Sequence, residues 1–195
     1  HLGIFATLVI SILLGFNLAE STAIGMIGAI DGPTVIYVNG KLGALFETPG
    51  LAAAIAVTAY SYMSLVPIIQ PPLMRLFTTK KERAIRMEYT PRPVSKMTVI
   101  LFPIFLTIFA GIFLPEAAPL IATLMLGNLI KESGVVEGLT ETSKNAITNT
   151  ATIFLGLTIG STMQAAQFLN TGTLRVLLLG LLAFALNTIG GLLFG

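Results

Sequence analysis

Seven long apolar runs limit what this sequence can fold into. They are His1–Phe16, Ser21–Val38, Leu51–Gln70, Val99–Leu114, Ala117–Ile130, Thr150–Met163 and Thr173–Phe194. A helix needs about 20 apolar residues to cross a bilayer, with a range of about 17–25. Leu51–Gln70 and Thr173–Phe194 meet this length, and Val99–Leu114 reaches it if Lys96 snorkels at its end. We therefore expect an all-α, polytopic membrane protein in a lipid bilayer, with about six to seven apolar segments.

The composition excludes several classes of site. Hydrophobic residues make up 54% of the chain and charged residues only 10%, and the mean hydropathy is +0.89. A soluble domain carries roughly 25% charged residues. The chain has no cysteine, and its single histidine is His1. Disulfides, thiol catalysis and Cys/His zinc sites are therefore excluded.

The basic residues are concentrated between two apolar runs. Seven of the eleven lie in residues 73–98, namely Arg75, Lys80, Lys81, Arg83, Arg86, Arg92 and Lys96. Such a stretch can attract nucleic acid, but between apolar segments the positive-inside rule explains it better. We predict that residues 73–98 form a basic cytoplasmic loop and that no nucleic acid is bound.

The two ends of the sequence suggest a fragment. The chain begins at His1, inside one apolar run, and stops at Gly195, inside another. We interpret residues 1–195 as a single transmembrane domain cut from a larger protein and truncated at both ends.

Asp31 is the only charged residue in the run Ser21–Val38. A charged side chain deep in a bilayer costs at least about 2.5–3.5 kcal/mol, so it usually persists for function and faces the protein interior. Gly28, Gly32 and Pro33 around it predict a helix that is broken at Asp31. We expect Ser21 to cap the first half, Gly28 to help end it and Pro33 to begin the second half.

A broken helix with an acid at the break is typical of cation sites in transporters. Asp31 would lie at the positive end of the second half, and freed carbonyls of the first half would point toward it. Together with Thr34 and Gly32, these oxygens suit a hard cation such as sodium. Three other interpretations stay open. Asp31 can be an acid in a solvated loop, Thr34 a capping hydroxyl and Gly32 a turn glycine.

Four hydroxyl groups lie close together within the span Leu51–Gln70, on Tyr60, Ser61, Tyr62 and Ser64. Tyr60 and Ser64 share a helix face, whereas Tyr62 points elsewhere. Hydrogen bonds between helices explain these groups as well as a role in a site does. The same two interpretations apply to Asn149, Thr150, Thr152, Asn187 and Thr188.

Several blocks of the sequence resemble one family. Ile24–Thr34 resembles the Gly-Gly-Ala-Asp-Gly-Pro-Thr signature of the β subunits of sodium-translocating carboxylic acid decarboxylases. Further blocks follow in the family's order, at Ala59–Met63, Pro67–Pro72, Thr79–Met87, Gly127–Val136 and Thr152–Gly156. Only Ala29-Ile30 departs from the signature, which has Gly-Ala before the aspartate.

This resemblance implies a subunit of the oxaloacetate, methylmalonyl-CoA or glutaconyl-CoA decarboxylase pumps. In that family a soluble subunit carboxylates biotin, and the β subunit decarboxylates carboxybiotin, exports sodium and consumes a proton. It further implies a multi-pass protein of the bacterial inner membrane with an inverted-repeat transporter fold. The expected partners are the biotin-carrying and carboxyltransferase subunits, a small membrane subunit and further copies of the chain.

The family's functional residues map onto matching positions of this chain. The essential aspartate corresponds to Asp31 and the functional tyrosine to Tyr62, and Gly32, Pro33 and Thr34 complete the motif. A second polar segment of the family has no match here, so the fragment alone is expected to be inactive. We further hypothesise that sodium and a proton compete for Asp31.

Two rival functions follow from the same features. A sodium-coupled secondary transporter of an organic anion would work without partner subunits. A membrane anchor for a soluble decarboxylase would not transport, and its turnover would not depend on sodium.

Overall fold

All regular secondary structure in the described part of the chain is helical. The computed structural model describes residues 1–86, 93–162 and 171–194. Three helices in these ranges are long and apolar enough to cross a membrane: α4 (Leu51–Phe77), α5 (Lys96–Phe113) and α10 (Thr171–Phe194). The predicted all-α class is confirmed, with three candidate spans. Met87, Arg92 and Met163, which belong to predicted segments, lie outside the described residues.

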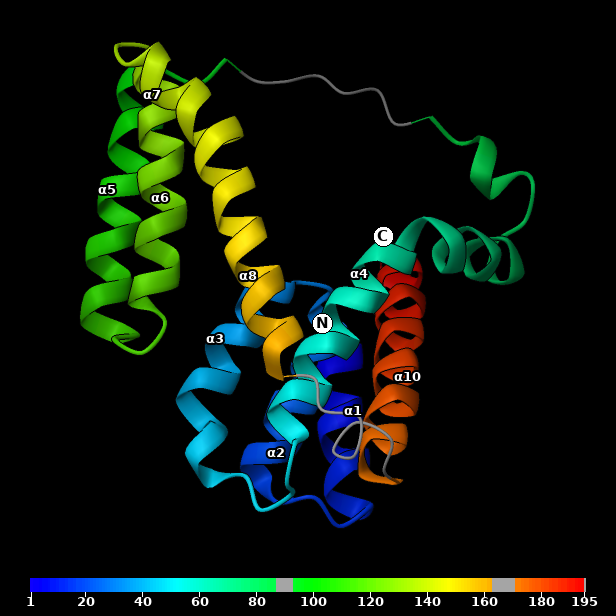
Figure 1. Ribbon diagram of the computed structural model, residues 1–195. Coiled ribbons are helices and arrows are strands. Elements are labelled where there is room, and N and C mark those ends of the chain that lie inside the picture. Colours follow the sequence, from blue (N-terminus) through cyan, green and yellow to red (C-terminus); the bar gives the residue numbers. More distant parts are fainter. Residues whose placement is uncertain (87–92, 163–170, 195) are drawn as a thin grey trace. The chain divides into compact units, whose positions relative to one another are not determined.

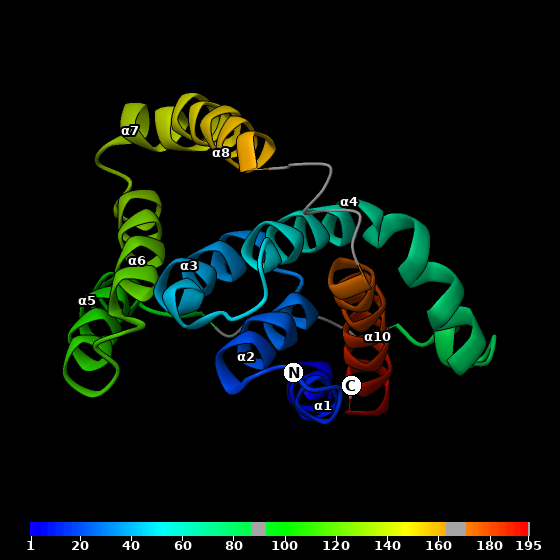
Figure 2. The same ribbon diagram turned by 60° about the horizontal axis from the view of Figure 1, so that its bottom comes forward.

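The chain divides into two compact units. The first contains His1–Arg86 and Thr158–Gly195, and the second contains Met87–Leu157. The helices of the first unit, besides α4 and α10, are α1 (Leu2–Leu13), α2 (Leu18–Met26) and α3 (Gly32–Leu42). In this unit α1 packs on α2 and α10, and α4 packs on α3 and α10 (Figures 1 and 2).

Glycines allow the helices of the first unit to approach closely. A Cβ atom at Gly3 of α1 would clash with the carbonyl oxygen of Ala183 in α10. A Cβ atom at Gly180 would lie 2.7 Å from the ring of Tyr62 and 2.8 Å from Cγ2 of Thr58, both in α4. Small residues are the usual means of packing membrane helices, and here they bring α1, α4 and α10 together.

Helix α4 continues beyond the predicted span. It passes through Pro67, Pro71 and Pro72 before it ends at Phe77, and Figure 2 shows its second half bending. Proline removes a helical hydrogen bond and is the usual cause of such a bend. The guanidinium of Arg83 then donates to the carbonyl of Thr78, just beyond the end of the helix.

The loop after α4 has its own local order. The amide and hydroxyl of Thr79 both donate to the carboxylate of Glu82, over 2.6 and 2.9 Å. These hydrogen bonds, with the nearby Arg83, lower the pKa of Glu82. Glu82 lies in the short 3₁₀ helix η3 (Glu82–Ala84).

The second unit begins with a helical hairpin. Helix α5 starts after Ser95, whose hydroxyl accepts from the amide of Thr98, and it packs on α6 (Ala118–Ser133). Helix α6 ends at Gly134, which has a left-handed φ of 66°, as is common for a glycine after a helix. The next elements are α7 (Glu137–Thr142), the π-helix η4 (Ser143–Ile147) and α8 (Thr148–Thr162).

Candidate functional site

The predicted break at Asp31 is present. Helix α2 ends at Met26, a 3₁₀ turn η1 (Ile27–Ala29) follows, and α3 begins at Gly32. The expected role of Gly28 in ending the first half is wrong, because the chain turns at Ile30. Ile30 has a φ of 59° and is the only non-glycine residue in the described ranges with a positive φ. Asp31 is extended, with a φ of −126°, and occupies the N-cap of α3.

The carboxylate of Asp31 is held by its own turn. Its Oδ1 accepts from the amide of Thr34 over 3.2 Å, and its Oδ2 accepts from the hydroxyl of Thr34 over 2.5 Å. The side chain is exposed and lies at the positive end of α3, which favours a negative charge. The structure therefore brings together Asp31, Gly32 and Thr34, the three predicted sodium ligands. Pro33 lies in the first turn of α3 but not at its first position, which is Gly32.

The start of α2 corrects the predicted cap. Asn17, rather than Ser21, is the N-cap. Its side chain accepts from the amide of Glu20, and the carboxylate of Glu20 accepts from the amide of Asn17. This capping box starts the helix earlier, so Ser21 lies inside it. The other oxygen of Glu20 accepts from the amides of Glu47 and Thr48, over 3.0 and 2.7 Å.

The two tyrosines of α4 face different elements, as their spacing predicts. The ring of Tyr60 lies against Gly32, where a Cβ atom would be only 2.7 Å from Cζ of that ring. The hydroxyl of Tyr62 donates to the carbonyl of Leu177 in α10 over 2.5 Å. In this structure Tyr62 thus links α4 to α10, and Tyr60 is the tyrosine that contacts the turn carrying Asp31.

Asn187 connects α10 to the break. Its side-chain amide donates to the carbonyl of Gly28 over 2.8 Å, and its Oδ1 is buried without a hydrogen-bond partner in the described part of the chain. One of the carbonyls freed by the break therefore already has a partner. The prediction that the freed carbonyls of the first half are available to a cation therefore does not hold for the carbonyl of Gly28.

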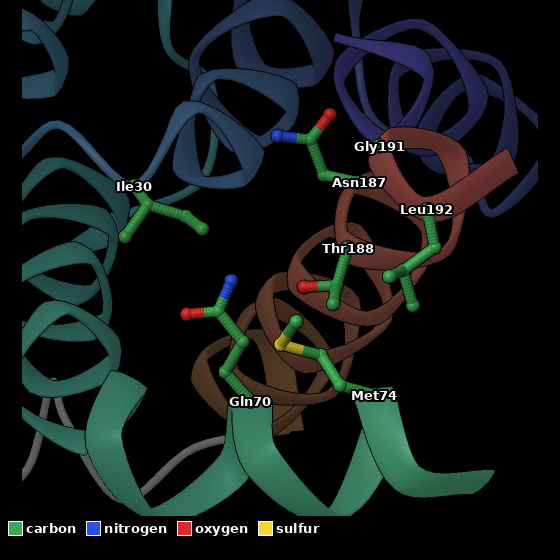
Figure 3. Close-up of a pocket in the computed structure, with 7 residues that line it drawn as sticks. All are labelled: Ile30, Gln70, Met74, Asn187, Thr188, Gly191 and Leu192. Atoms are coloured by element: carbon green, nitrogen blue, oxygen red, sulfur yellow. The ribbon is translucent and has the colours of Figure 1, made fainter. Parts of the chain in front are cut away.

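A pocket of about 320 Å³ lies beside the break (Figure 3). Its lining residues are Ile30, Gln70, Met74, Asn187, Thr188, Gly191 and Leu192. Figure 3 shows the side chains of Gln70 and Thr188 reaching into the same space from α4 and α10, with Ile30 at its edge. The pocket therefore places neutral polar groups next to the residue that precedes Asp31.

The chemistry of these groups fits an alkali cation better than a transition metal. No group of three or more His, Cys, Asp or Glu side chains capable of holding a metal occurs among the residues that the structure describes. One carboxylate with the hydroxyl of Thr34 beside it offers the oxygen donors that a hard cation takes. The side-chain oxygens of Tyr60 and Asn187, which have no hydrogen-bond partner among the described residues, are consistent with this.

Four residues of this region carried no specific prediction. Glu20 and Asn17 could have been found from their capping-box spacing. Tyr60 and Asn187 were noted only as ambiguous polar groups, since their partners, Gly32 and Gly28, lie far away in sequence. Of the other ambiguous residues, Thr188 lines the pocket beside Asn187, whereas Thr152 bonds back to its own helix through the carbonyl of Thr148.

Comparison with known proteins identifies the family. Residues 1–195 match the model of the Na⁺-transporting oxaloacetate decarboxylase beta subunit. The chain belongs to this family. The resemblance inferred from the sequence blocks is thereby confirmed.

Curated relatives cover the three decarboxylases that the resemblance implied. The chain is 53% identical to methylmalonyl-CoA decarboxylase subunit beta of Veillonella parvula over 195 residues, which are 100% of this chain and 51% of the relative. It is 50% identical to glutaconyl-CoA decarboxylase subunit beta of Acidaminococcus fermentans over 195 residues, again all of this chain and 50% of the relative. The oxaloacetate decarboxylase beta chain of Klebsiella pneumoniae is 49% identical over 197 aligned positions, 98% of this chain and 44% of the relative. The chain thus spans about half the length of these relatives.

Proposed function

We propose that the protein containing this chain is the membrane subunit of a biotin-dependent decarboxylase that pumps sodium. The subunit couples decarboxylation of carboxybiotin to sodium export and consumes a proton. Membership of the family and the three candidate spans support this proposal. The observation that carries it is Asp31, an acid at the N-terminus of a half-helix within a broken apolar segment.

In this proposal the occupant of Asp31 decides whether the site is loaded with sodium or has released it. Asp31, Gly32 and Thr34 hold sodium, and a proton that reaches the carboxylate displaces it. The pocket beside Ile30 adds the polar side chains of Gln70, Asn187 and Thr188, among apolar residues, to the surroundings of the break. Tyr62 retains its proposed functional role, now with an attachment to α10 through the carbonyl of Leu177.

The wider assembly is part of the same proposal. The biotin-carrying and carboxyltransferase subunits present carboxybiotin, and a small membrane subunit and further copies of the chain complete the complex. The complex resides in the bacterial inner membrane with the basic loop, residues 73–98, on the cytoplasmic side. The complete subunit has an inverted-repeat transporter fold, of which this chain is one transmembrane domain with six to seven apolar segments.

The test compares Asp31→Asn with Glu47→Gln in the full-length subunit, reconstituted with its partners in vesicles. Both variants remove one negative charge, but Glu47 is exposed and lies outside the break. We expect Asp31→Asn to reduce sodium flux and sodium-dependent decarboxylation by about tenfold or more, since loss of an interaction with a charged group costs about 1.5–3 kcal/mol. Glu47→Gln should leave both rates unchanged.

Other outcomes would favour the rival functions. If Asp31→Asn retained both rates with the complex assembled, the subunit would be better described as an anchor. If the full-length subunit alone took up sodium together with an organic anion, a secondary transporter would be the better account.

A further inference from the structure

The phenol end of Tyr60 lies directly on the turn that carries Asp31. A Cβ atom at Gly32 would be 2.7 Å from Cζ, 2.8 Å from Cε2 and 3.0 Å from Cε1 of the Tyr60 ring. These three atoms form the end of the ring that bears the hydroxyl. Only a glycine at position 32 leaves room for this contact, so the hydroxyl of Tyr60 is held beside the residue that follows Asp31.

The hydroxyl of Tyr60 differs from the other hydroxyls of α4. It is buried and has no hydrogen-bond partner among the residues that the structure describes. Thr58 and Ser64 donate to the backbone of their own helix, and Tyr62 donates to α10. A buried hydroxyl without a partner costs about 1–3 kcal/mol, so its persistence beside Asp31 requires an explanation.

A sodium ion at Asp31 supplies that explanation. Asp31 offers a carboxylate and Thr34 a hydroxyl, both within one turn of α3. A hard cation takes several oxygen ligands, and the described residues contain no cluster of three or more His, Cys, Asp or Glu side chains that could supply them. A neutral oxygen from a neighbouring helix would add a further ligand. The hydroxyl oxygen of Tyr60 in α4 lies at this place and has no other partner among the described residues.

We infer that Tyr60 is a sodium-binding residue of this site, and that its hydroxyl oxygen joins Asp31 and Thr34 around the ion. This inference rests on the proposed function, since it takes sodium as the ion held at Asp31. It also separates the two tyrosines. Tyr60 binds the ion from α4, whereas Tyr62 joins α4 to α10.

Thermal unfolding of the full-length complex, purified in detergent and titrated with sodium, tests this role without measuring turnover. A ligand that binds only the folded state raises the melting temperature as its concentration passes its dissociation constant. We expect Tyr60→Phe to need about ten times more sodium for the same rise in melting temperature, a change the size of one bond to a charged group. Without sodium, Tyr60→Phe should melt at the same or a higher temperature, because it removes an unpartnered buried hydroxyl.

Two other variants complete the experiment. Tyr37→Phe removes a tyrosine hydroxyl from α3, where the ring of Tyr37 lies under Lys41, and should leave the sodium titration unchanged. Asp31→Asn should abolish the sodium effect and so tests the proposed function itself. An unchanged titration for Tyr60→Phe, with the effect abolished by Asp31→Asn, would overturn the inference alone. A normal sodium effect in Asp31→Asn would overturn both.

Discussion

Two carboxylates stand at the beginnings of the two half-helices of the broken segment, and they are held in opposite ways. Glu20 in the first turn of α2 is 2% exposed and accepts from the amides of Asn17, Glu47 and Thr48. Asp31 at the N-cap of α3 is exposed and accepts from Thr34 in its own turn. A buried carboxylate bonded to three amides holds the backbone in place, whereas one bonded only locally remains accessible to an ion.

The partners of Glu20 show what it stabilises. Glu47 and Thr48 belong to the connection between α3 and α4, so Glu20 joins this connection to the start of α2. The oxygens of Asp31 make no such long-range bond among those that the structure shows. The two acids therefore predict opposite results for mutation, and the following experiments test that contrast.

The largest loss of stability is expected for Glu20→Ala. It removes the buried acceptor of three part-buried amides, and the loss of each hydrogen bond to a charged group costs about 1.5–3 kcal/mol. We expect the free energy of unfolding of the full-length protein in detergent to fall by about 3 kcal/mol or more. Glu47→Ala, at an exposed side chain, should change it by less than about 0.5 kcal/mol. Equal effects of the two substitutions would show that Glu20 is not a structural anchor.

Substitutions of Ile30, at the end of the first half-helix, are expected to have an intermediate effect on the free energy of unfolding. Ile30 is in the left-handed region, which costs an L-residue about 1–2 kcal/mol but costs glycine little. Ile30→Gly and Ile30→Ala both remove the isoleucine side chain beyond Cβ. The difference between their free energies of unfolding therefore measures the cost of the left-handed backbone conformation. We expect the glycine variant to be about 1 kcal/mol more stable in a denaturant titration.

Position 36 in α3 supplies the matched control for this pair. At a helical position glycine is about 1 kcal/mol less favourable than alanine, so Ile36→Gly should be less stable than Ile36→Ala. The same order at both positions would mean that the turn at Ile30 is not left-handed in the folded protein.

The sequence predicted the features of this region that depend on nearby residues. One acid among apolar residues, with Gly28, Gly32 and Pro33 beside it, was enough to locate the break. The longest apolar runs were enough to predict α4 and α10. The spacing of Tyr60 and Tyr62 also predicted that they face different elements, because helical geometry alone decides this.

Features that depend on contacts between distant segments could not be predicted. The bond of Asn187 to Gly28 joins residues 159 positions apart, and no local pattern indicates which carbonyl a side chain of α10 will reach. The contact of Tyr60 with Gly32 likewise depends on how α3 packs on α4. The left-handed conformation of Ile30 was not predicted either, because an isoleucine rarely adopts it and no local pattern indicates it.

The smallest effect on stability, and the one that decides the comparison, is expected for Asp31→Asn. Asparagine caps a helix about as well as aspartate, and the loss of favourable charge at the helix end, about 0.3–1 kcal/mol, is offset by the lower cost of placing a neutral group in an apolar region. Without sodium, the free energy of unfolding should therefore change by less than about 0.5 kcal/mol. A fall of about 2 kcal/mol or more would place Asp31 with Glu20 as a structural group. A negligible change, together with the loss of sodium flux, would mean that the acid at the break contributes to ion binding and not to folding.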